Sequence, residues 1–549
     1  MIQIRNLKLP ADEPQSALTA LAAKKLRLPP EAIGELRILK RSLDARKKDD
    51  IRYVYTVGVT VPGGEERAAA RAKSPDIAVY APPEYTVPRV GEPEKRPLVV
   101  GFGPAGMFAA LVLARAGMRP IVAERGQDAL TRKERVERFH RTGELDTECN
   151  IQFGEGGAGT FSDGKLNTGT HDPRLRWMLA EFAAHGAPES VTYDAKPHIG
   201  TDILIGVVQS IRREIIALGG EVRFGTRLER LVIDGGRLTG AVLSAAGEEY
   251  TVPCGELILA IGHSARDSFE TLHAQNVPME RKAFSMGVRI EHLQPAIDLA
   301  QYGRERGGLP AADYSLNVRL PDGTSAYTFC MCPGGQVFAA ASEAGGVVTN
   351  GMSYSRRDGE NANSALLVTL HTEDFPGSGV LAGMYWQREI ERAAYAYGGG
   401  NYLAPAQRVG EFLAGRASTG PGEVKPSYRP GVVWGDICEV LPERITGVLR
   451  RALPELGKKL RGFDAPDAVL TAPETRSSSP VRILRDASLS SEIAGLYPCG
   501  EGAGYAGGIS SAAVDGMRCA EAVIKRHMPE NAPYRLPLEG KVARRSRDG

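Results

Sequence analysis

The sequence lacks any long hydrophobic run. No uninterrupted apolar segment approaches the roughly 20 residues that a membrane-spanning helix needs. The first residues, MIQIRNLKLPADEP, contain no apolar core of a signal peptide. We therefore expect a cytoplasmic protein that works without a membrane.

Cysteine is scarce, and its spacing excludes two classes of protein. The seven cysteines are an odd number, are scattered, and form no C-x-x-C pair. This pattern argues against a secreted disulfide scaffold and against a zinc site, so no metal is expected.

Neither sign of charge is in excess. The 68 Lys and Arg residues nearly balance the 66 Asp and Glu residues, which gives a formal net charge of +2. Such a balance supplies no general attraction to nucleic acid or to an anionic membrane. The expected partner is a small-molecule substrate, and the sequence leaves the oligomeric state open.

The 549 residues are too many for one ordinary hydrophobic core. Changes in composition and in the pattern of apolar residues along the chain predict four parts. Residues 1–90 predict a small α+β module that ends in a linker rich in Pro and charge. Residues 91–268 begin with a strand–helix–strand unit typical of a doubly wound sheet. Residues 269–465 mix strand-like segments with irregular Gly- and Asn-rich loops, and residues 466–549 return to strand, glycine loop and helix.

The stretch VVGFGPAGMFAALVLARAGMRPIVAERG, which starts at Val99, carries a dinucleotide fingerprint. Gly101 permits the tight turn after the strand, Gly103 permits close approach of a pyrophosphate, and Gly106 permits close packing of the helix on the sheet. The helix that follows presents free N–H groups to phosphates. Glu124 lies at the end of the next strand, where a carboxylate can accept hydrogen bonds from ribose hydroxyls.

Two further glycine loops favour FAD over NAD. The loop GEGAGYAGGISSAAVDG, from Gly500, follows an apolar strand and precedes a helix, whose N-terminus can stabilise negative charge on a reduced flavin. Glu501 is a candidate for binding hydroxyls of the ribityl chain. The middle loop, QFGEGGAGTFSDGKLNTGT, has no helical period after its glycines and predicts a strap across the cofactor.

These motifs carry a family resemblance. Gly101–Gly106, Glu124, ELILAIGHS and YPCGEGAG resemble the FAD-binding domain of the glutathione-reductase-like superfamily. More closely, FGEGGAGTFSDGKL, FSMGVRIEH, FCMCPGG, ETRSSSPVRI and LYPCGEGAGYAGGISSAAVDG resemble the bacterial FAD-dependent dehydrogenase family of uncharacterised function. The resemblance covers nearly the whole chain and implies FAD and an oxidoreductase, but no substrate.

The predicted fold class is therefore α/β: a Rossmann-like doubly wound FAD-binding domain, split by an inserted mixed α+β substrate or cap domain and preceded by the small N-terminal α+β module. The residues predicted to bind FAD, several of them only through the resemblance, are Gly101, Gly103, Pro104, Ala105, Gly106, Glu124, Arg125, Gly154, Gly157, Ser162, Asp163, Gly164, Lys165, Leu228, Ala260, Gly262, Gly500, Glu501, Gly507, Gly508 and Ile509.

Three side chains are candidates for catalysis. His263 follows the strand that closes the FAD domain and is a candidate to shuttle a proton, although a structural histidine explains the position equally simply. Lys165 lies in the strap, as a contact of flavin or phosphate. Arg476, in ETRSSSPVRI beside Glu474, is either a clamp for an anionic substrate or part of an ion pair between domains.

Cys330 and Cys332 are two residues apart in FCMCPGG. On a regular strand they would share one face at about 6.5–7 Å between Cα atoms, which strains a disulfide. Buried apolar cysteines are therefore favoured over a redox dithiol, and the absence of C-x-x-C argues against a thioredoxin-reductase activity.

The electron donor stays open, because FAD occupies the one convincing fingerprint. NAD(P)H as a transient co-substrate, the substrate itself, and another protein are the alternatives. Two other functions also remain: a flavin-dependent monooxygenase, and an RNA- or protein-binding factor with a vestigial flavin fold, supported only by the basic residues of the N-terminal module.

Overall fold

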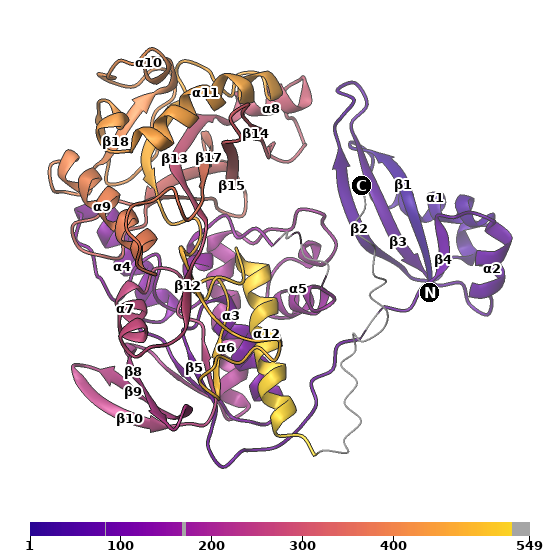
Figure 1. Cartoon of the computed structure of the whole chain (residues 1–549). Coiled ribbons are helices and arrows are strands. Elements are labelled where there is room, and N and C mark those ends of the chain that lie inside the picture. Colours follow the sequence, from indigo (N-terminus) through magenta and orange to yellow (C-terminus); the bar gives the residue numbers. More distant parts are fainter. Residues whose placement is uncertain (83, 167–168, 170–171, 530–549) are drawn as a thin grey trace.

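The computed structural model describes residues 1–82, 84–166, 169 and 172–529, and it shows three regions (Figure 1). They are a small N-terminal module, a parallel-sheet domain that the first and last parts of the chain share, and a larger mixed-sheet domain inserted between those parts. The predicted fold class is confirmed. No helix of these residues is long and apolar enough to cross a membrane.

The N-terminal module is a four-stranded antiparallel sheet with two helices packed on it. The strand order is β2-β3-β1-β4, and apolar side chains such as Ile2, Ile4 and Val57 are fully buried beneath the helices. Its elements are β1 (Ile2–Pro10), α1 (Ala17–Leu26), η1 (Pro30–Ala32), β2 (Leu36–Asp44), β3 (Arg52–Val59), α2 (Glu65–Ala72) and β4 (Ile77–Val79).

One arginine of β2 attaches this module to the next domain. The backbone N–H of Arg41 donates to the Tyr193 carbonyl at 2.7 Å, and Ala195 N–H donates to the Arg41 carbonyl at 2.8 Å. The Arg41 guanidinium donates to both oxygens of Asp194, at 2.6 and 2.8 Å. A basic residue of the module is thus used for docking within the chain.

The parallel-sheet domain contains the strand order β22-β11-β5-β6-β7. Its chain begins at β5 in the centre and runs outward in both directions, so the topological switch point lies beside β5, where open α/β sheets bind ligands. The first part contains β5 (Leu98–Val100), α3 (Pro104–Arg115), β6 (Ile121–Ala123), α4 (Ala129–Thr142), η2 (Ala158–Phe161), α5 (Arg174–Ala184), η3 (Glu189–Thr192), α6 (Thr201–Ala217), β7 (Glu221–Arg223), β8 (Thr226–Asp234), β9 (Arg237–Ala245), β10 (Glu248–Pro253), β11 (Leu257–Leu259) and α7 (Arg266–Ala274).

The C-terminal segment completes this sheet. β22 (Leu496–Pro498) pairs with β11 in parallel, and α12 (Ile509–Arg526) packs along α3. β8, β9 and β10 form a separate three-stranded antiparallel sheet at the side of the domain (Figure 1).

The inserted domain is built on a mixed sheet in the order β14-β15-β17-β13-β20-β18-β19, with β16 paired to β15. Its elements are β13 (Phe284–Leu293), α8 (Gln294–Tyr302), β14 (Asn317–Arg319), β15 (Ser325–Ala339), β16 (Thr349–Met352), β17 (Asn361–Leu370), α9 (Ala382–Tyr397), β18 (Ala404–Arg408), α10 (Val409–Leu413), β19 (Val432–Trp434), η4 (Ile437–Glu439), α11 (Glu443–Lys459) and β20 (Val469–Glu474). β12 (Met279–Arg281) pairs with β21 (Val481–Ile483) where the chain enters and leaves this domain.

The structure corrects one predicted boundary. Residues from 466 onward were assigned to the FAD-binding domain, but β20 pairs antiparallel with β13 and belongs to the inserted sheet. The apolar strand could not reveal its partner, because β13 lies some 180 residues earlier in the chain.

Close packing of α3 on α12 depends on glycine. An added Cβ at Gly516 of α12 would lie 2.0 Å from the Ala105 carbonyl oxygen, well inside contact distance. At Gly106 of α3, an added Cβ would lie 1.9 Å from the Gly101 carbonyl oxygen. Gly516 thus allows α12 to approach α3 closely, and Gly106 allows α3 to approach the turn that precedes it.

We expect Gly516→Ala to lower the free energy of unfolding by about 1–3 kcal/mol, because the new methyl group overpacks the α3–α12 contact. The control is Gly206→Ala on α6, where nothing lies within 4 Å of an added Cβ. That variant should gain stability by about 0.5–1 kcal/mol, because alanine is the better helix former. Denaturant unfolding measures both, and equal effects of the two variants would contradict the packing argument.

Candidate functional site

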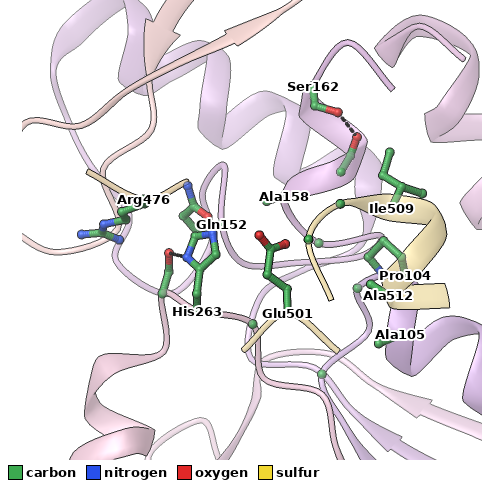
Figure 2. A pocket seen from close by; sticks show the side chains of 18 of the residues that line it. Pro104, Ala105, Gln152, Ala158, Ser162, His263, Arg476, Glu501, Ile509 and Ala512 are labelled. Carbon is green, nitrogen blue, oxygen red and sulfur yellow. Dashed lines mark hydrogen bonds between the residues drawn. The ribbon is translucent and has the colours of Figure 1, made fainter. Parts of the chain in front are cut away.

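A cavity of about 440 Å³ lies at the carboxyl ends of β5, β6 and β11, between the N-termini of α3 and α12. It continues to β15 of the inserted domain. Figure 2 shows Pro104 and Ala105 of α3 beside Ile509 and Ala512 of α12, with Glu501 directed into the space between them and the His263 and Gln152 side chains. The site is therefore made by segments that are about four hundred residues apart in the chain.

Most of the predicted cofactor residues lie on the wall of this cavity. They are Gly101, Gly103, Pro104, Ala105, Glu124, Arg125, Gly157, Ser162, Lys165, Leu228, Ala260, Gly262, Glu501, Gly507, Gly508 and Ile509. Five others are not part of the wall and act through the backbone or through other side chains: Gly106, Gly154, Asp163, Gly164 and Gly500.

The first glycine loop has the geometry that its sequence predicts. Gly101 has a φ of +95°, and an added Cβ there would lie 2.3 Å from the Ala260 carbonyl oxygen. Gly103 is the N-cap of α3 and faces the cavity, and Pro104 occupies the first helical turn, where its missing N–H costs nothing. An added Cβ at Gly103 meets only the Gly157 Cα, at 3.6 Å. Gly103 thus leaves space toward the cavity, whereas Gly101 and Gly106 satisfy the fold.

Glu124 holds the loops together. One oxygen of its buried carboxylate accepts from Phe102 N–H at 2.7 Å. The other accepts from Gly126 N–H at 2.9 Å and from Gly154 N–H at 2.8 Å. The residue predicted as a ribose anchor therefore lines the cavity and also ties the fingerprint turn to the middle loop.

The middle loop crosses the fingerprint turn at a close contact between Gly157 and Gly103. An added Cβ at Gly157, whose φ is +62°, would lie 2.7 Å from the Gly103 Cα. The loop leads into the short helix η2 and not into an α-helix, as the missing period predicts. Asp163, predicted to face the cofactor, instead accepts from Ser353 and pairs with Arg357 of the inserted domain. This polar contact fastens the strap to the opposite side of the site.

Arg132 of α4 supports the same loop through hydrogen bonds and was not among the residues predicted from the sequence. Its fully buried guanidinium donates to the carbonyl groups of Asn150, Ile151 and Glu155 at 2.6–2.8 Å. Burial lowers the pKa of Arg132 to about 10, which leaves the side chain charged at neutral pH. The carbonyl partners carry no signal in the sequence, because any residue provides one.

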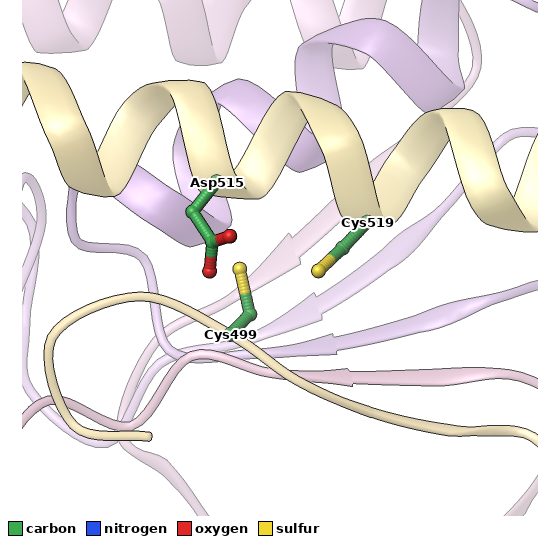
Figure 3. A group of neighbouring side chains, drawn as sticks. All are labelled: Cys499, Asp515 and Cys519. Carbon is green, nitrogen blue, oxygen red and sulfur yellow. The ribbon is translucent and has the colours of Figure 1, made fainter. Parts of the chain in front are cut away.

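The third loop is fixed by an ion pair. Asp515 of α12 accepts from Gly500 N–H at 2.8 Å and from both terminal nitrogens of Arg485, at 2.7 and 2.9 Å. Asp515 lies beside Cys499 and Cys519, a group with the spacing of metal ligands (Figure 3). Arg485 also lies 3.5 Å from the Cys519 Sγ, so a guanidinium already contacts two members of this group.

Two carboxyl groups on the cavity wall, those of the buried Glu474 and the half-buried Glu501, have raised pKa values. Burial raises the pKa of Glu501 to about 7 and that of Glu474 to about 8. Glu474 lies 3.2 Å from the Arg289 Nε of β13. Both carboxyl groups can hold or release a proton near neutral pH. Arg289, inside the strand-like segment FSMGVRIEH, was not among the site residues predicted from the sequence.

The structure corrects two of the catalytic predictions. Burial, with the charges of Arg476 and Arg266, lowers the pKa of His263 to about 3, so its imidazole is neutral and does not titrate between pH 5 and 8. Its Nδ1 lies 3.0 Å from the Ser264 Oγ. Arg476 lines the cavity, but its guanidinium already pairs with the carboxylate of Glu391, at 2.7 and 3.0 Å. The ion-pair interpretation of Arg476 therefore holds, and the anion-clamp interpretation does not. Lys165 remains on the cavity wall.

Glu391 of α9 is the centre of a buried charge network between the two large domains. Arg266 of α7 donates to both of its oxygens at 2.8 Å, and Arg476 binds the same two oxygens. Glu343 accepts from Arg266 and Arg388 on the outer side. The two arginines lower the pKa of Glu391 well below its usual range.

We expect Glu391→Gln to lower the free energy of unfolding by about 3–5 kcal/mol at pH 7, because it leaves two buried arginines without their carboxylate. A depressed pKa gives stability above the unfolded value of 4.5 that is lost as the pH falls. The difference from the parent protein should therefore shrink below about pH 4. Glu389→Gln, on the exposed face of the same helix, is the control and should change stability little. An equal loss in both variants, or a pH-independent difference, would contradict this account.

A fold with a single parallel sheet, three glycine loops and two helix N-termini on one cavity defines the class of nucleotide-binding proteins with a doubly wound domain. Residues 283–477 match the family model described as FAD-dependent protein, C-terminal domain-like, and residues 1–60 match a model described as a domain of unknown function.

The chain belongs to the same family as an uncharacterised protein of Clostridium beijerinckii. The two are 49% identical over 533 residues, which are 96% of this chain and 99% of the relative.

Solved structures overlap this chain in part. A flavin-dependent brominase covers 80% of this chain and 81% of its own, with 15% identity and a TM-score of 0.35. A geranylgeranyl bacteriochlorophyll reductase-like protein of Thermoplasma acidophilum covers 79% and 80%, with 12% identity and a TM-score of 0.34. A glycine oxidase of Bacillus cereus covers 79% and 96%, with 12% identity and a TM-score of 0.30.

Proposed function

We propose that this protein is an FAD-dependent oxidoreductase that transfers a hydride between the flavin and a small-molecule substrate. The observation that carries the proposal is the convergence of the N-termini of α3 and α12 on one cavity. Each helix offers unpaired N–H groups and the positive end of its dipole. One such terminus suits a pyrophosphate, and the second suits the electron-rich edge of a reduced flavin.

The residues of the wall fit the parts of FAD. Glu124 and Leu228 would hold the adenosine end, Gly103 and Gly157 would leave room for the pyrophosphate, and Gly508 with Ile509 would face the flavin ring. Arg125 at the adenosine end is held by Asp267 and Glu148 and stacks over the Phe153 ring at 4.1 Å. When bound, FAD supplies the two-electron redox chemistry.

The protein's own groups would position substrate and manage protons. Glu474 and Glu501, whose pKa values lie near 8 and 7, are two groups that can give or take a proton at neutral pH. His263 stays neutral and can only donate or accept a hydrogen bond. The inserted domain covers this end of the cavity through β15, and the small substrate we propose would bind there.

NAD(P)H is the electron donor that we propose, docking transiently in the same cavity. The visible spectrum of the purified protein, followed by anaerobic mixing with NADH or NADPH, tests both parts. A yellow protein that bleaches within seconds supports the proposal. A yellow protein that does not bleach excludes NAD(P)H as the donor and leaves the substrate or another protein in that role. A colourless protein that FAD cannot reconstitute contradicts the proposal as a whole.

We expect Gly103→Leu to abolish retention of FAD, because its side chain would project from the α3 N-cap into the pyrophosphate's path. Gly206→Leu is the matched control, on an exposed face of α6 with nothing within 4 Å. Flavin content per chain after gel filtration measures the difference. If the Gly103 variant stays folded and fully yellow, the assignment of the fingerprint is wrong.

A further inference from the structure

Two cysteines lie on β15, at the part of the cavity wall that the inserted domain provides. Phe329, Cys330 and Met331 line the cavity, and Cys330 is half-buried. The strand is irregular here. Its register against β17 shifts between Phe329 and Cys332, and Cys330 has a φ of +41°, in the left-handed region that non-glycine residues rarely adopt. Backbone strain of this kind gathers at functional sites.

The irregularity changes how the two thiols lie. On a regular strand the two side chains would be separated by a full pleat repeat. Instead the Cys332 Sγ donates to the carbonyl oxygen of its neighbour Cys330, at 3.2 Å, so this sulfur turns back toward the Cys330 backbone. The regular-strand spacing from which the sequence predicts strain therefore does not apply to this pair.

Positive charge gathers at this pair. The fully buried guanidinium of Arg289 donates to the Cys330 carbonyl at 3.1 and 3.3 Å and lies 3.6 Å from the Cys332 Sγ. Lys165 of the strap lies on the same wall. The neighbouring Cys332 thiol, with Arg289 and Lys165, lowers the pKa of Cys330 against the effects of burial and of the Asp163 carboxylate.

Cys332 has the opposite character. Burial and the neighbouring Cys330 raise its pKa well above the ordinary value. The lowered pKa thus belongs to the cysteine on the cavity wall, and the raised pKa to the cysteine behind it. These properties suit Cys330 as the attacking cysteine and Cys332 as the resolving cysteine. Burial raises the pKa of four other thiols: Cys149, Cys254, Cys438 and Cys499.

We propose that Cys330 and Cys332 form a redox-active dithiol that exchanges with a small organic disulfide entering the cavity. The cavity volume of about 440 Å³ and the half-buried position of Cys330 fit a low-molecular-weight substrate. This activity goes beyond the proposed hydride transfer and does not require bound flavin for the exchange itself.

The exchange balances in two steps. The Cys330 thiolate attacks one sulfur of R–S–S–R, the substrate S–S bond breaks, and RS⁻ leaves with the electron pair. Cys332 gives its proton to this thiolate, attacks Cys330 in the mixed disulfide, and expels the second RS⁻. The dithiol is oxidised to one internal disulfide, and the substrate is reduced to RSH and RS⁻. Two electrons and two protons from a dithiol reagent reset the pair in the experiment below.

The test uses the full-length protein, reduced with dithiothreitol, desalted, and mixed with 2-hydroxyethyl disulfide at pH 7 without oxygen. Acid quenching and peptide mapping then locate the modified sulfurs. The parent protein should yield a disulfide joining Cys330 to Cys332. Cys332→Ser should retain a mercaptoethanol adduct on Cys330, because no resolving thiol remains, whereas Cys330→Ser should leave Cys332 unmodified.

Cys438→Ser is the matched control, because Cys438 is the other half-buried cysteine, and it should behave as the parent protein. In the parent protein, a limiting amount of iodoacetamide should alkylate Cys330 at least about tenfold faster than Cys438. This comparison needs no variant and therefore stands even where a substitution prevents folding.

Equal alkylation of Cys330 and Cys438 would overturn the proposal, as would a mixed disulfide on Cys330 that never closes onto Cys332. The visible spectrum is recorded on the same samples. A colourless protein that still forms the Cys330–Cys332 disulfide supports the exchange and contradicts the flavin proposal. A yellow protein that forms no such disulfide contradicts the exchange alone.

Discussion

The close approach of α3 and α12 is the constraint on which the rest of this structure depends. Gly516 allows the two helices to touch through the Ala105 carbonyl, and their N-termini consequently reach the same cavity from two ends of the chain. A bulkier residue at this contact would separate two sources of N–H groups that only work on one ligand when they converge. The Glu124 carboxylate then joins the middle loop to the same assembly, because it accepts from Gly154 N–H as well as from Phe102 and Gly126. The Arg485–Asp515 pair fixes the third loop.

The inserted domain supplies one wall of this cavity through β15. The Glu391 network fastens it to the parallel-sheet domain by buried charge, because Glu391 of α9 pairs with Arg266 of α7. The same burial sets the protonation of the side chains inside. It holds Glu474 and Glu501 near neutral pKa values and keeps His263 uncharged. Arg289 can act on two parts of the cavity wall, because it contacts both Glu474 and the cysteine pair.

How much of this was predictable from sequence differs between backbone and side chains. The turn at Gly101 and the helix start at Gly103 were predictable, because a local pattern of glycines and apolar residues determines local backbone geometry. The partner of Arg476 was not predictable, because Glu391 lies 85 residues earlier, on helix α9, and no local pattern joins the two residues. The role of Asp163 was misplaced for the same reason, since Arg357 and Ser353 come from the inserted domain.

The prediction about Cys330 and Cys332 failed for a different reason. The spacing of the two cysteines was visible in the sequence, but the argument from spacing assumed a regular strand, and β15 is irregular at this point. The boundary at residue 465 failed because strand pairing is a long-range property: β20 joins β13 and not the parallel sheet. Local rules were thus reliable where the chain contacts itself nearby, and they failed where distant segments meet.

The position of bound FAD is the most direct test of the central claim that α3 and α12 serve one dinucleotide. In a crystal structure of the protein with FAD, the account predicts the pyrophosphate at the N-terminus of α3, beside Gly103, and the flavin ring at the N-terminus of α12, beside Ile509. FAD bound with its flavin ring away from α12, or with only its adenosine half in the cavity, would contradict it.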